Sequence, residues 1–277
     1  MGSERRSQIY LLTGRLNDAG DRQVHPLWMD AKTKMQEDGM FKMVVPVMAI
    51  LAFSFQHAFS HDVWLQQKDG KLIVAYGHGE KLESYDSAKV KEVKALDCKG
   101  ASVPLDIDGQ QGSVSINPKG AAAVTVLFDG GYGVKTTDGW KKITKREAQD
   151  KFSIIEARKS QKYAKVLLTP CDTSSKPVGT LFEIVPEKDP FKAKPGEALT
   201  LKVFLEGKPL EGAVVKTATR DDSQPKDLPK TDKDGRVNVS IAKPGFQLIT
   251  TSYGVPLKDD PDADVLSLGA SLTFEAR

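Results

Sequence analysis

The chain has 277 residues and carries 40 Lys and Arg against 37 Asp and Glu, so its formal net charge is only +3. Basic and acidic residues are mixed along the sequence. No basic stretch is dense enough to neutralise clustered phosphates, which argues against a nucleic-acid partner. Charged residues make up 28% of the chain and aromatic residues 7%. That balance is typical of a soluble globular protein, and the length allows two ordinary domains.

The first 39 residues are mostly polar and show no periodic pattern of apolar side chains. They end directly before Met40, which is followed by the basic Lys42 and a long apolar run. A signal sequence normally begins close to its initiator methionine. We therefore expect Met40 to be the true start, and residues 1–39 to be an over-extended or disordered N-terminus without function.

Residues 40–60 have the three parts of a secretory signal peptide. Lys42 forms a short basic region, Met43–Phe55 is apolar, and Ala58 and Ser60 are the small residues of a cleavage site. As a helix, this apolar run rises only about 20 Å, whereas the hydrocarbon core of a bilayer is about 30 Å thick. The pattern predicts export to the periplasm and cleavage directly after Ser60.

Residues 61–178 consist of short alternating segments separated by turn residues, which indicates a β-sandwich. Strands are expected at 63–67, 71–76, 90–96, 113–117 and 122–128, and the Lys-Asp-Gly turn at 68–70 joins the first two. Asp129-Gly-Gly-Tyr-Gly reads as a hairpin loop that follows the last of them. Thr144–Ser160 contains neither Gly nor Pro and predicts one helix, with Thr144 and Glu147 as a capping box.

Residues 179–277 repeat the strand-and-turn pattern and predict an immunoglobulin-like sandwich that closes without help from the first half. Strands are expected at 181–186, 198–205, 213–219 and 271–274, with two more after the turns at 231–235 and 243–245. The fold class is therefore all-β, with two antiparallel β-sandwich domains that meet at residues 178 and 179 and one helix in the first.

Only two of the four histidines, His61 and His78, follow residue 60. After cleavage at Ser60, His61 offers its α-amine and its imidazole to one metal ion, and His78 on the neighbouring strand adds a third nitrogen. Nitrogen-rich sets of this kind suit Cu²⁺ or Ni²⁺. Asp62 and Glu80 are candidates to complete the coordination shell, and Glu83 reads as a solvated strand-end carboxylate. The alternative is that His78 is a turn residue bonded to backbone and His61 a strand cap.

Several motifs of the chain resemble a group of bacterial domains of unknown function that are described as periplasmic components of nickel or cobalt uptake systems. They are HDVWLQQ, VAYGHGEKLESYD, FDGGYGVKTTDGW and IVPEKDP followed by KPGEALTLKVFLEGKPLEGA. His61, Asp62 and Trp64 match the opening motif of that group, and His78 matches its Gly-His element. The resemblance implies a β-sandwich fold, a periplasmic location and nickel or cobalt as cargo. The segment 266–270 departs from the group because it contains no further histidine.

Four other residues are candidates for a role near a site. Tyr132 and Trp140 are expected to rim it, or else to be ordinary core or edge aromatics. Cys98 and Cys171 are the two cysteines, and an oxidising compartment permits a disulfide between them. The alternative is two separate thiols, because both lie in turn-like segments that need not be close in space.

The chain lacks the motifs of a catalyst. It contains no G-x-S-x-G, no H-E-x-x-H and no nucleotide-phosphate loop, so neither an enzyme nor a nucleotide partner is expected. The acidic segments at 232–234 and 259–264 read as turns and not as calcium loops.

We expect an extracytoplasmic binding protein for a transition-metal ion, nickel or cobalt before copper, that feeds an inner-membrane uptake transporter. The alternative is an exported structural or adhesive sandwich that binds sugar or protein without metal.

The signal-peptide pattern gives a direct prediction. When the chain is expressed from Met40 in a bacterium, the protein should accumulate in the periplasm with His61 as its first residue. N-terminal sequencing and intact mass measure this outcome. A periplasmic product that keeps residues 40–60, or a product confined to the cytoplasm, would contradict it.

Overall fold

The computed structural model describes residues 61–277 except 80, 111, 220–221 and 223–224. The expected N-terminal extension, residues 1–39, and the expected signal peptide, residues 40–60, lie outside the described residues. The described residues belong to one compact unit of the chain. Within them, no helix is long and apolar enough to cross a membrane.

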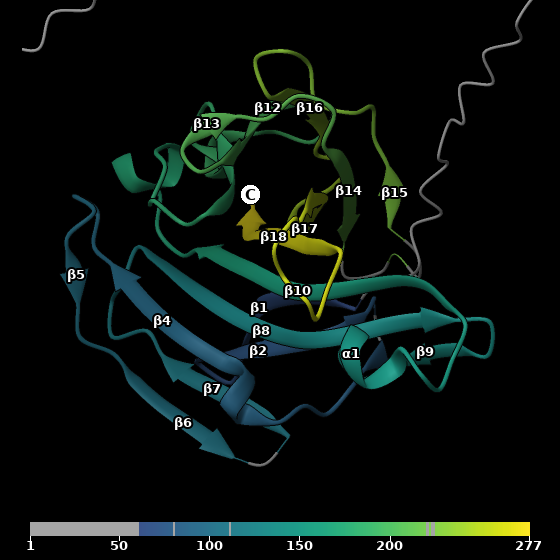
Figure 1. Cartoon of the computed structure of the whole chain (residues 1–277). Helices are drawn as coiled ribbons and strands as arrows, with labels where there is room; N and C mark the ends of the chain where they lie inside the picture. Colours follow the sequence, from purple (N-terminus) through teal and green to yellow (C-terminus); the bar gives the residue numbers. More distant parts are fainter. Residues whose placement is uncertain (1–60, 80, 111, 220–221, 223–224) are drawn as a thin grey trace, which may run out of the picture. The chain divides into compact units, whose positions relative to one another are not determined.

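Almost every regular element in the described part is a β-strand, and the strands form three sheets (Figure 1). The first sheet has the order β1 (Asp62–Lys68), β2 (Lys71–His78), β7 (Ser113–Asn117) and β6 (Asp106–Gln110), with β3 (Lys81–Leu82) paired to β2. The third sheet has the order β11 (Phe182–Pro186), β12 (Ala198–Leu205) and β13 (Lys208–Pro209), with β16 (Arg236–Ser240) paired to β12.

The central sheet is the largest of the three and contains the longest strands. Its order is β15 (Lys226–Asp227), β14 (Val214–Thr219), β17 (Gly245–Pro256), β18 (Val265–Ala276), β10 (Ile154–Leu167), β8 (Ala123–Thr136), β4 (Val90–Leu96) and β5 (Ser102–Val103), with β9 (Gly139–Lys141) paired to β8. The helical elements are short: α1 (Lys145–Ala148) and the 3₁₀ turns η1 (Ser87–Lys89), η2 (Asp172–Ser175) and η3 (Pro190–Lys192). The predicted all-β sandwich fold with one α-helix is confirmed.

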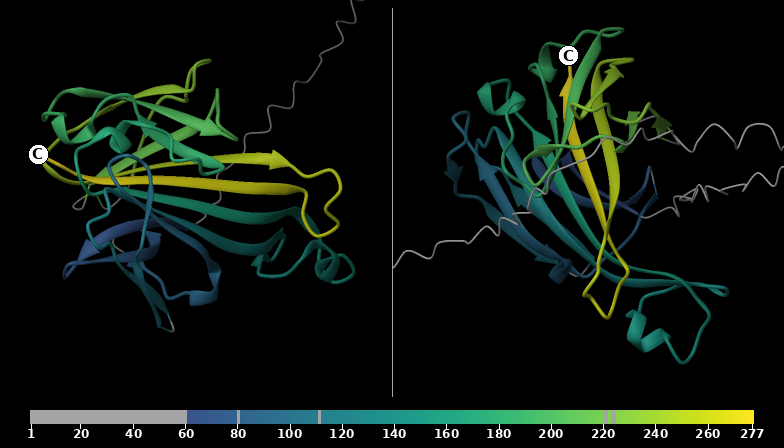
Figure 2. Two further views of the ribbon diagram at one scale, coloured as in Figure 1. Left: turned by 90° about the vertical axis from the view of Figure 1, so that its left-hand side faces the viewer. Right: turned by 45° about the horizontal axis from the view of Figure 1, so that its top comes forward.

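The two smaller sheets cover opposite faces of the central sheet. Successive side chains of a strand point to opposite faces, and β10 uses both: Ala164 and Val166 pack in the core beneath the first sheet, whereas Leu167 packs in the core beneath the third. The left panel of Figure 2 shows the long central strands between the green strands of the third sheet and the blue strands of the first. Each small sheet therefore makes one sandwich with the same central sheet.

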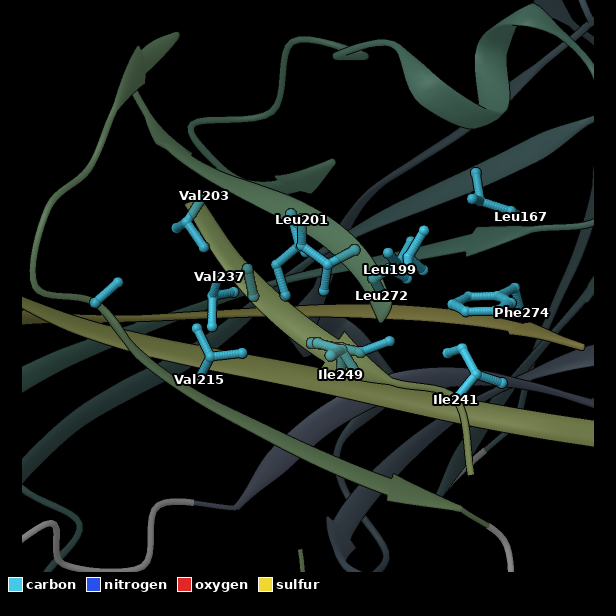
Figure 3. Packing of buried hydrophobic residues seen from close by; sticks show 14 of the residues in the cluster. Leu167, Leu199, Leu201, Val203, Val215, Val237, Ile241, Ile249, Leu272 and Phe274 are labelled. Atoms are coloured by element: carbon cyan, nitrogen blue, oxygen red, sulfur yellow. The ribbon is translucent and has the colours of Figure 1, made fainter. Parts of the chain in front are cut away.

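The larger core lies between the third sheet and the central sheet (Figure 3). Leu199, Leu201 and Val203 alternate along β12 and face Ile249 and Leu272 of the central sheet. The alternation in the sequence predicts this face directly, because every second residue of a strand shares it. The predicted and observed limits of β12 are the same, 198–205.

Strands from both sides of the expected domain boundary are joined in the central sheet. β10 precedes residue 178, β18 follows it, and the two pair in parallel from Arg158↔Val265 to Val166↔Thr273. Residues 178 and 179 lie in the connection between η2 and β11. The boundary therefore divides neither the central sheet nor the core beneath the third sheet, to which Ala123 and Leu167 of the first half also belong. Whether residues 179–277 fold alone stays a prediction.

The predicted helix at 144–160 is correct only at its start. Thr144 caps α1 in a capping box with Glu147, as expected, but the helix ends at Ala148. From Ile154 the chain is strand β10, which pairs with β8 on one side and β18 on the other. The local preference for helix is overridden here because the segment hydrogen-bonds to β8 from Ile154 and also to β18 from Arg158.

The predicted hairpin loop at 129–133 is also corrected by the structure. This glycine-rich segment lies inside β8, which continues unbroken to Thr136. Opposite it, the register of β10 shifts between Ser160 and Gln161, so the segment contains a β-bulge. A Cβ atom on Gly130 would lie 2.8 Å from the side chain of Ser160. The glycine permits close approach of two strands and does not mark a turn.

A buried ion pair connects the two sides of the expected boundary. The Lys165 ammonium on β10 lies 2.6 Å from Glu183 on β11, and the two side chains are only 4% and 2% exposed. Glu183 also accepts hydrogen bonds from the backbone N–H groups of Val178 (2.9 Å) and Gly179 (3.1 Å). Burial lowers the pKa of Lys165, and the charge of Glu183 opposes this shift. The Glu183 carboxylate therefore holds β10, through Lys165, and the linker that precedes β11.

This pair gives a stability prediction. Lys165→Met should lower the free energy of unfolding by about 3–5 kcal/mol, because it leaves Glu183 buried without its counter-charge. Lys165→Met combined with Glu183→Gln should cost less than the sum of the two single changes. Denaturant melts measure both. As a control, Lys176→Met removes the exposed Lys176–Asp172 pair and should cost below about 1 kcal/mol. Strict additivity of the two buried changes would contradict the coupling.

Candidate functional site

The β1–β2 hairpin brings the two candidate histidines together. Its turn places Asp69 at φ 50° and Gly70 at φ 77°, as a tight turn between two strands requires. The register pairs Asp62 with Gly77, so His61 lies across from His78. The two imidazole rings stack with centroids 4.5 Å apart and an interplanar angle of 27°. The predicted proximity of these residues on neighbouring strands is correct.

The histidine pair is the outer end of a column of aromatic rings. His61 stacks on Tyr76 at 4.8 Å, and Tyr76 stacks on the buried Phe128 of β8 at 5.3 Å. Tyr85 packs edge-on against Phe128, and its hydroxyl donates a hydrogen bond to the Val74 carbonyl oxygen at 2.9 Å. The histidine rings are therefore supported by the core between the first and the central sheet.

Glu83 contacts the histidine pair through its carboxylate. Its Oε1 lies 2.6 Å from Nε2 of His61, and the side chains of His61 and Glu83 are 31% and 53% exposed. The chain reaches this position because β3 returns along β2 and pairs Leu82 with Gly77, where a Cβ atom would lie 2.1 Å from the Lys81 carbonyl oxygen. Glu83 is thus a strand-end carboxylate that stays exposed to solvent, and beyond that expectation it also contacts the first histidine.

Asp62 lies on the other side of β1 from His61 and interacts with two lysines. Burial raises the pKa of Asp62, and the positive charges of Lys162, His78 and Lys216 oppose the shift. Lys162 on β10 is only 6% exposed, and burial lowers its pKa while Asp62 opposes that change. Asp62 therefore acts as a counter-charge to Lys162, which competes with the predicted role of a metal ligand.

The surroundings of His78 favour its uncharged imidazole. Burial lowers the pKa of His78, and the neighbouring His61 adds to the effect, whereas Asp62 and Glu83 oppose it. A neutral imidazole keeps the lone pair that binds a metal or accepts a hydrogen bond. Within residues 61–277, apart from the six undescribed positions, no group of three or more His, Cys, Asp or Glu side chains is arranged to hold a metal ion. The predicted ligand Glu80 lies outside the described residues.

The two aromatic residues expected to rim the site lie on the extension of the central sheet. Tyr132 on β8 is contacted by the Lys159 ammonium, 5.4 Å from its ring centroid, and Trp140 on β9 by the Arg158 guanidinium at 5.5 Å. Trp140 is 45% exposed. Both rings belong to cation–π contacts between β8, β9 and β10.

The acidic segments form turns and ion pairs, as the sequence predicted. Asp232 accepts hydrogen bonds from the backbone N–H groups of Asp234 and Arg236 within its hairpin turn. In the second segment, Asp262 binds the Arg146 guanidinium through both oxygens, and Asp264 pairs with Lys145. Both carboxylates join the β17–β18 loop to α1.

Sequence analysis missed Tyr76 and Lys162 as parts of the site's surroundings. Tyr76 was detectable, because it shares the alternating face of β2 with His78 and lies two residues before it. Lys162 was not, because it lies about a hundred residues away in the chain, just beyond the segment 144–160 that the sequence predicted as a helix. A buried lysine becomes visible only when the pairing of β10 is known.

The fold and the site together define a β-sandwich protein with a histidine pair at the start of its first sheet. The chain belongs to the family called Domain of unknown function (DUF4198), whose model matches residues 58–254. It is 28% identical over 240 residues to an uncharacterized protein of Haemophilus influenzae (strain Rd), covering 85% of this chain and 98% of that protein. The expected membership of a bacterial family of unknown function is confirmed, and neither name refers to nickel or cobalt.

A solved structure, the D0-D1 domain of Intimin, is similar to 77% of this chain and 97% of its own. The sequence identity is 14% and the TM-score 0.21. A score this low carries no argument about fold or function.

The buried Lys162 gives a prediction about the support of the site. A Cβ atom at Gly269 on β18 would lie 2.6 Å from Cδ and 3.0 Å from Nζ of Lys162. Gly269→Ala should therefore push the lysine away from Asp62 and cost about 1–3 kcal/mol of stability, as overpacking does. Thermal melts measure the change. Gly109→Ala on the exposed β6 is the control, because its Cβ would meet the nearest side chain at 3.8 Å. Equal stability of the two variants would contradict the steric argument.

Proposed function

We propose that this protein is an extracytoplasmic binding protein for a divalent transition-metal ion, nickel or cobalt before copper. In this proposal His61 and His78 supply the donor nitrogens, and the bound ion is passed to an uptake transporter in the inner membrane. The function is binding and transfer without a chemical reaction, and the metal ion is cargo. The family relationship supports the fold and the bacterial setting of the proposal but not its metal.

The observation that carries the proposal is the contact between Glu83 and Nε2 of His61, with the His78 ring stacked on the same imidazole. A metal-binding histidine commonly donates its other ring N–H to a carboxylate, which fixes the ring and makes the remaining nitrogen a better donor. When Nε2 of His61 donates to Glu83, Nδ1 is the nitrogen left for a ligand. Glu83 thus supports the metal-binding orientation without being a ligand itself.

The same nitrogen makes the position of His61 significant. Nδ1 is close enough to the residue's own backbone to form a chelate ring together with an α-amine. If cleavage follows Ser60, His61 provides amine and imidazole as one unit, and His78 provides a third nitrogen from the adjacent strand. Such a set suits Ni²⁺ and Cu²⁺. The histidine pair without that amine offers only two nitrogens.

Titration calorimetry with Ni²⁺, Co²⁺ and Cu²⁺ tests the proposal. His61→Ala and His78→Ala should each weaken binding about 10-fold or more, and Glu83→Gln about 10-fold or more through loss of the supporting contact. A residue added ahead of His61 converts its amine to an amide and should weaken binding as much as His61→Ala. Glu92→Gln, an exposed carboxylate on β4 paired with Lys94, is the matched control and should bind normally.

Each element of the proposal has its own contradicting result. If the variant with a residue added ahead of His61 binds as tightly as the protein that begins at His61, the chelate with the α-amine is wrong. If Glu83→Gln binds as the control does, the carboxylate has no role in positioning His61. If the unmodified protein binds none of the three ions, the metal function is wrong, and binding of sugar or protein by an exported sandwich takes its place.

A further inference from the structure

The two cysteines lie on neighbouring turns although 73 positions separate them in the sequence (171 minus 98). Cys98 is exposed in the turn between β4 and β5, and Cys171 is half-buried at the start of η2. Both line one cavity of about 540 Å³ at the edge of the central sheet. Distance along the chain therefore gives no indication of how close these two side chains are.

Hydrogen bonds hold the two turns against each other. The Thr173 hydroxyl donates to the Asp97 carbonyl oxygen at 2.8 Å. This bond joins the turn that carries Cys171 to the turn that carries Cys98. Asp97 accepts hydrogen bonds from the backbone N–H groups of Lys99 and Ala101, which shapes the turn that carries Cys98. The Cys171 backbone N–H donates to the Ser174 hydroxyl at 3.1 Å. Both cysteines are therefore fixed at their backbones.

The thiols themselves are in contact. The side chain of Cys171 is the largest cause that raises the pKa of Cys98, to about 11. At neutral pH Cys98 is therefore mainly a protonated thiol, which slows its attack on a disulfide oxidant without preventing it. Its exposure gives an oxidant access, and the fixed position of Cys171 gives the first oxidised sulfur a partner within the same molecule.

We propose that Cys98 and Cys171 form an intramolecular disulfide in an oxidising compartment. Two S–H bonds break and one S–S bond forms. The two electrons and the two protons pass to a disulfide oxidant, such as oxidised glutathione, whose S–S bond breaks to give two thiols. The bond closes a long loop that contains β5 to β10, and it stabilises the fold chiefly by restricting the unfolded chain. This proposal is independent of metal binding.

The test uses the full chain, purified with a reductant and then exposed to oxidised glutathione. After denaturation, the oxidised protein should take up no thiol-alkylating reagent at Cys98 or Cys171, and it should run as a monomer on a non-reducing gel. Its Tm should exceed that of the reduced protein by about 10 °C. Cys98→Ser, Cys171→Ser and the double variant should all melt close to the reduced protein and should not respond to the oxidant.

The contradicting results are specific. Two alkylatable thiols after oxidation, or dimers linked through Cys98, would overturn the intramolecular bond. A glutathione adduct that remains on Cys98 in the oxidised protein would show that Cys171 does not reach it. A double variant that still gains stability from the oxidant would assign the effect to another group. Metal titration of the reduced protein separates this proposal from the metal site, because the thiols are not part of that site.

Discussion

The parallel pairing of β10 with β18 is the contact on which the rest of the structure depends. It joins two segments about a hundred residues apart over nine consecutive positions, from Arg158 to Val166 on one strand. Without it the central sheet is two separate ribbons, β4–β8–β10 and β14–β17–β18. With it, one sheet offers two faces, and each face has room for one smaller sheet and one core.

The candidate site depends on this pairing although it lies on neither strand. β1 packs across β10 and β18, and the Thr273 hydroxyl on β18 donates to the Leu65 carbonyl oxygen on β1 at 2.8 Å. Lys162 of β10 fits beside the bare backbone of Gly269 on β18 and faces Asp62, the residue next to His61. The hairpin that presents the histidines is therefore positioned by two strands that also belong to the other sandwich.

The sequence predicted what short-range physics determines. Alternation and turn residues gave the limits of β4, β7 and β12, the β1–β2 hairpin, and with it the approach of His61 to His78. The capping box at Thr144 also follows from residues three apart. The predicted length of that helix was wrong because pairing with β8 and, from Arg158, with β18 decides the conformation of residues 154–160. The contact of Glu83 with His61 was not predicted for a related reason: the close pairing of β3 with Gly77 is a property of the folded backbone.

The place of β18 in the sheet has a consequence for the order of folding. It is the last strand of the chain, ending at Ala276, and it lies between β17 and β10. An inner strand cannot be added after its neighbours have paired with each other. The central sheet therefore closes only when the C-terminal residues are available, so a growing or partly threaded chain keeps the edge of β10 open. Such late, long-range closure slows folding, because the central sheet cannot be completed from local hairpins alone.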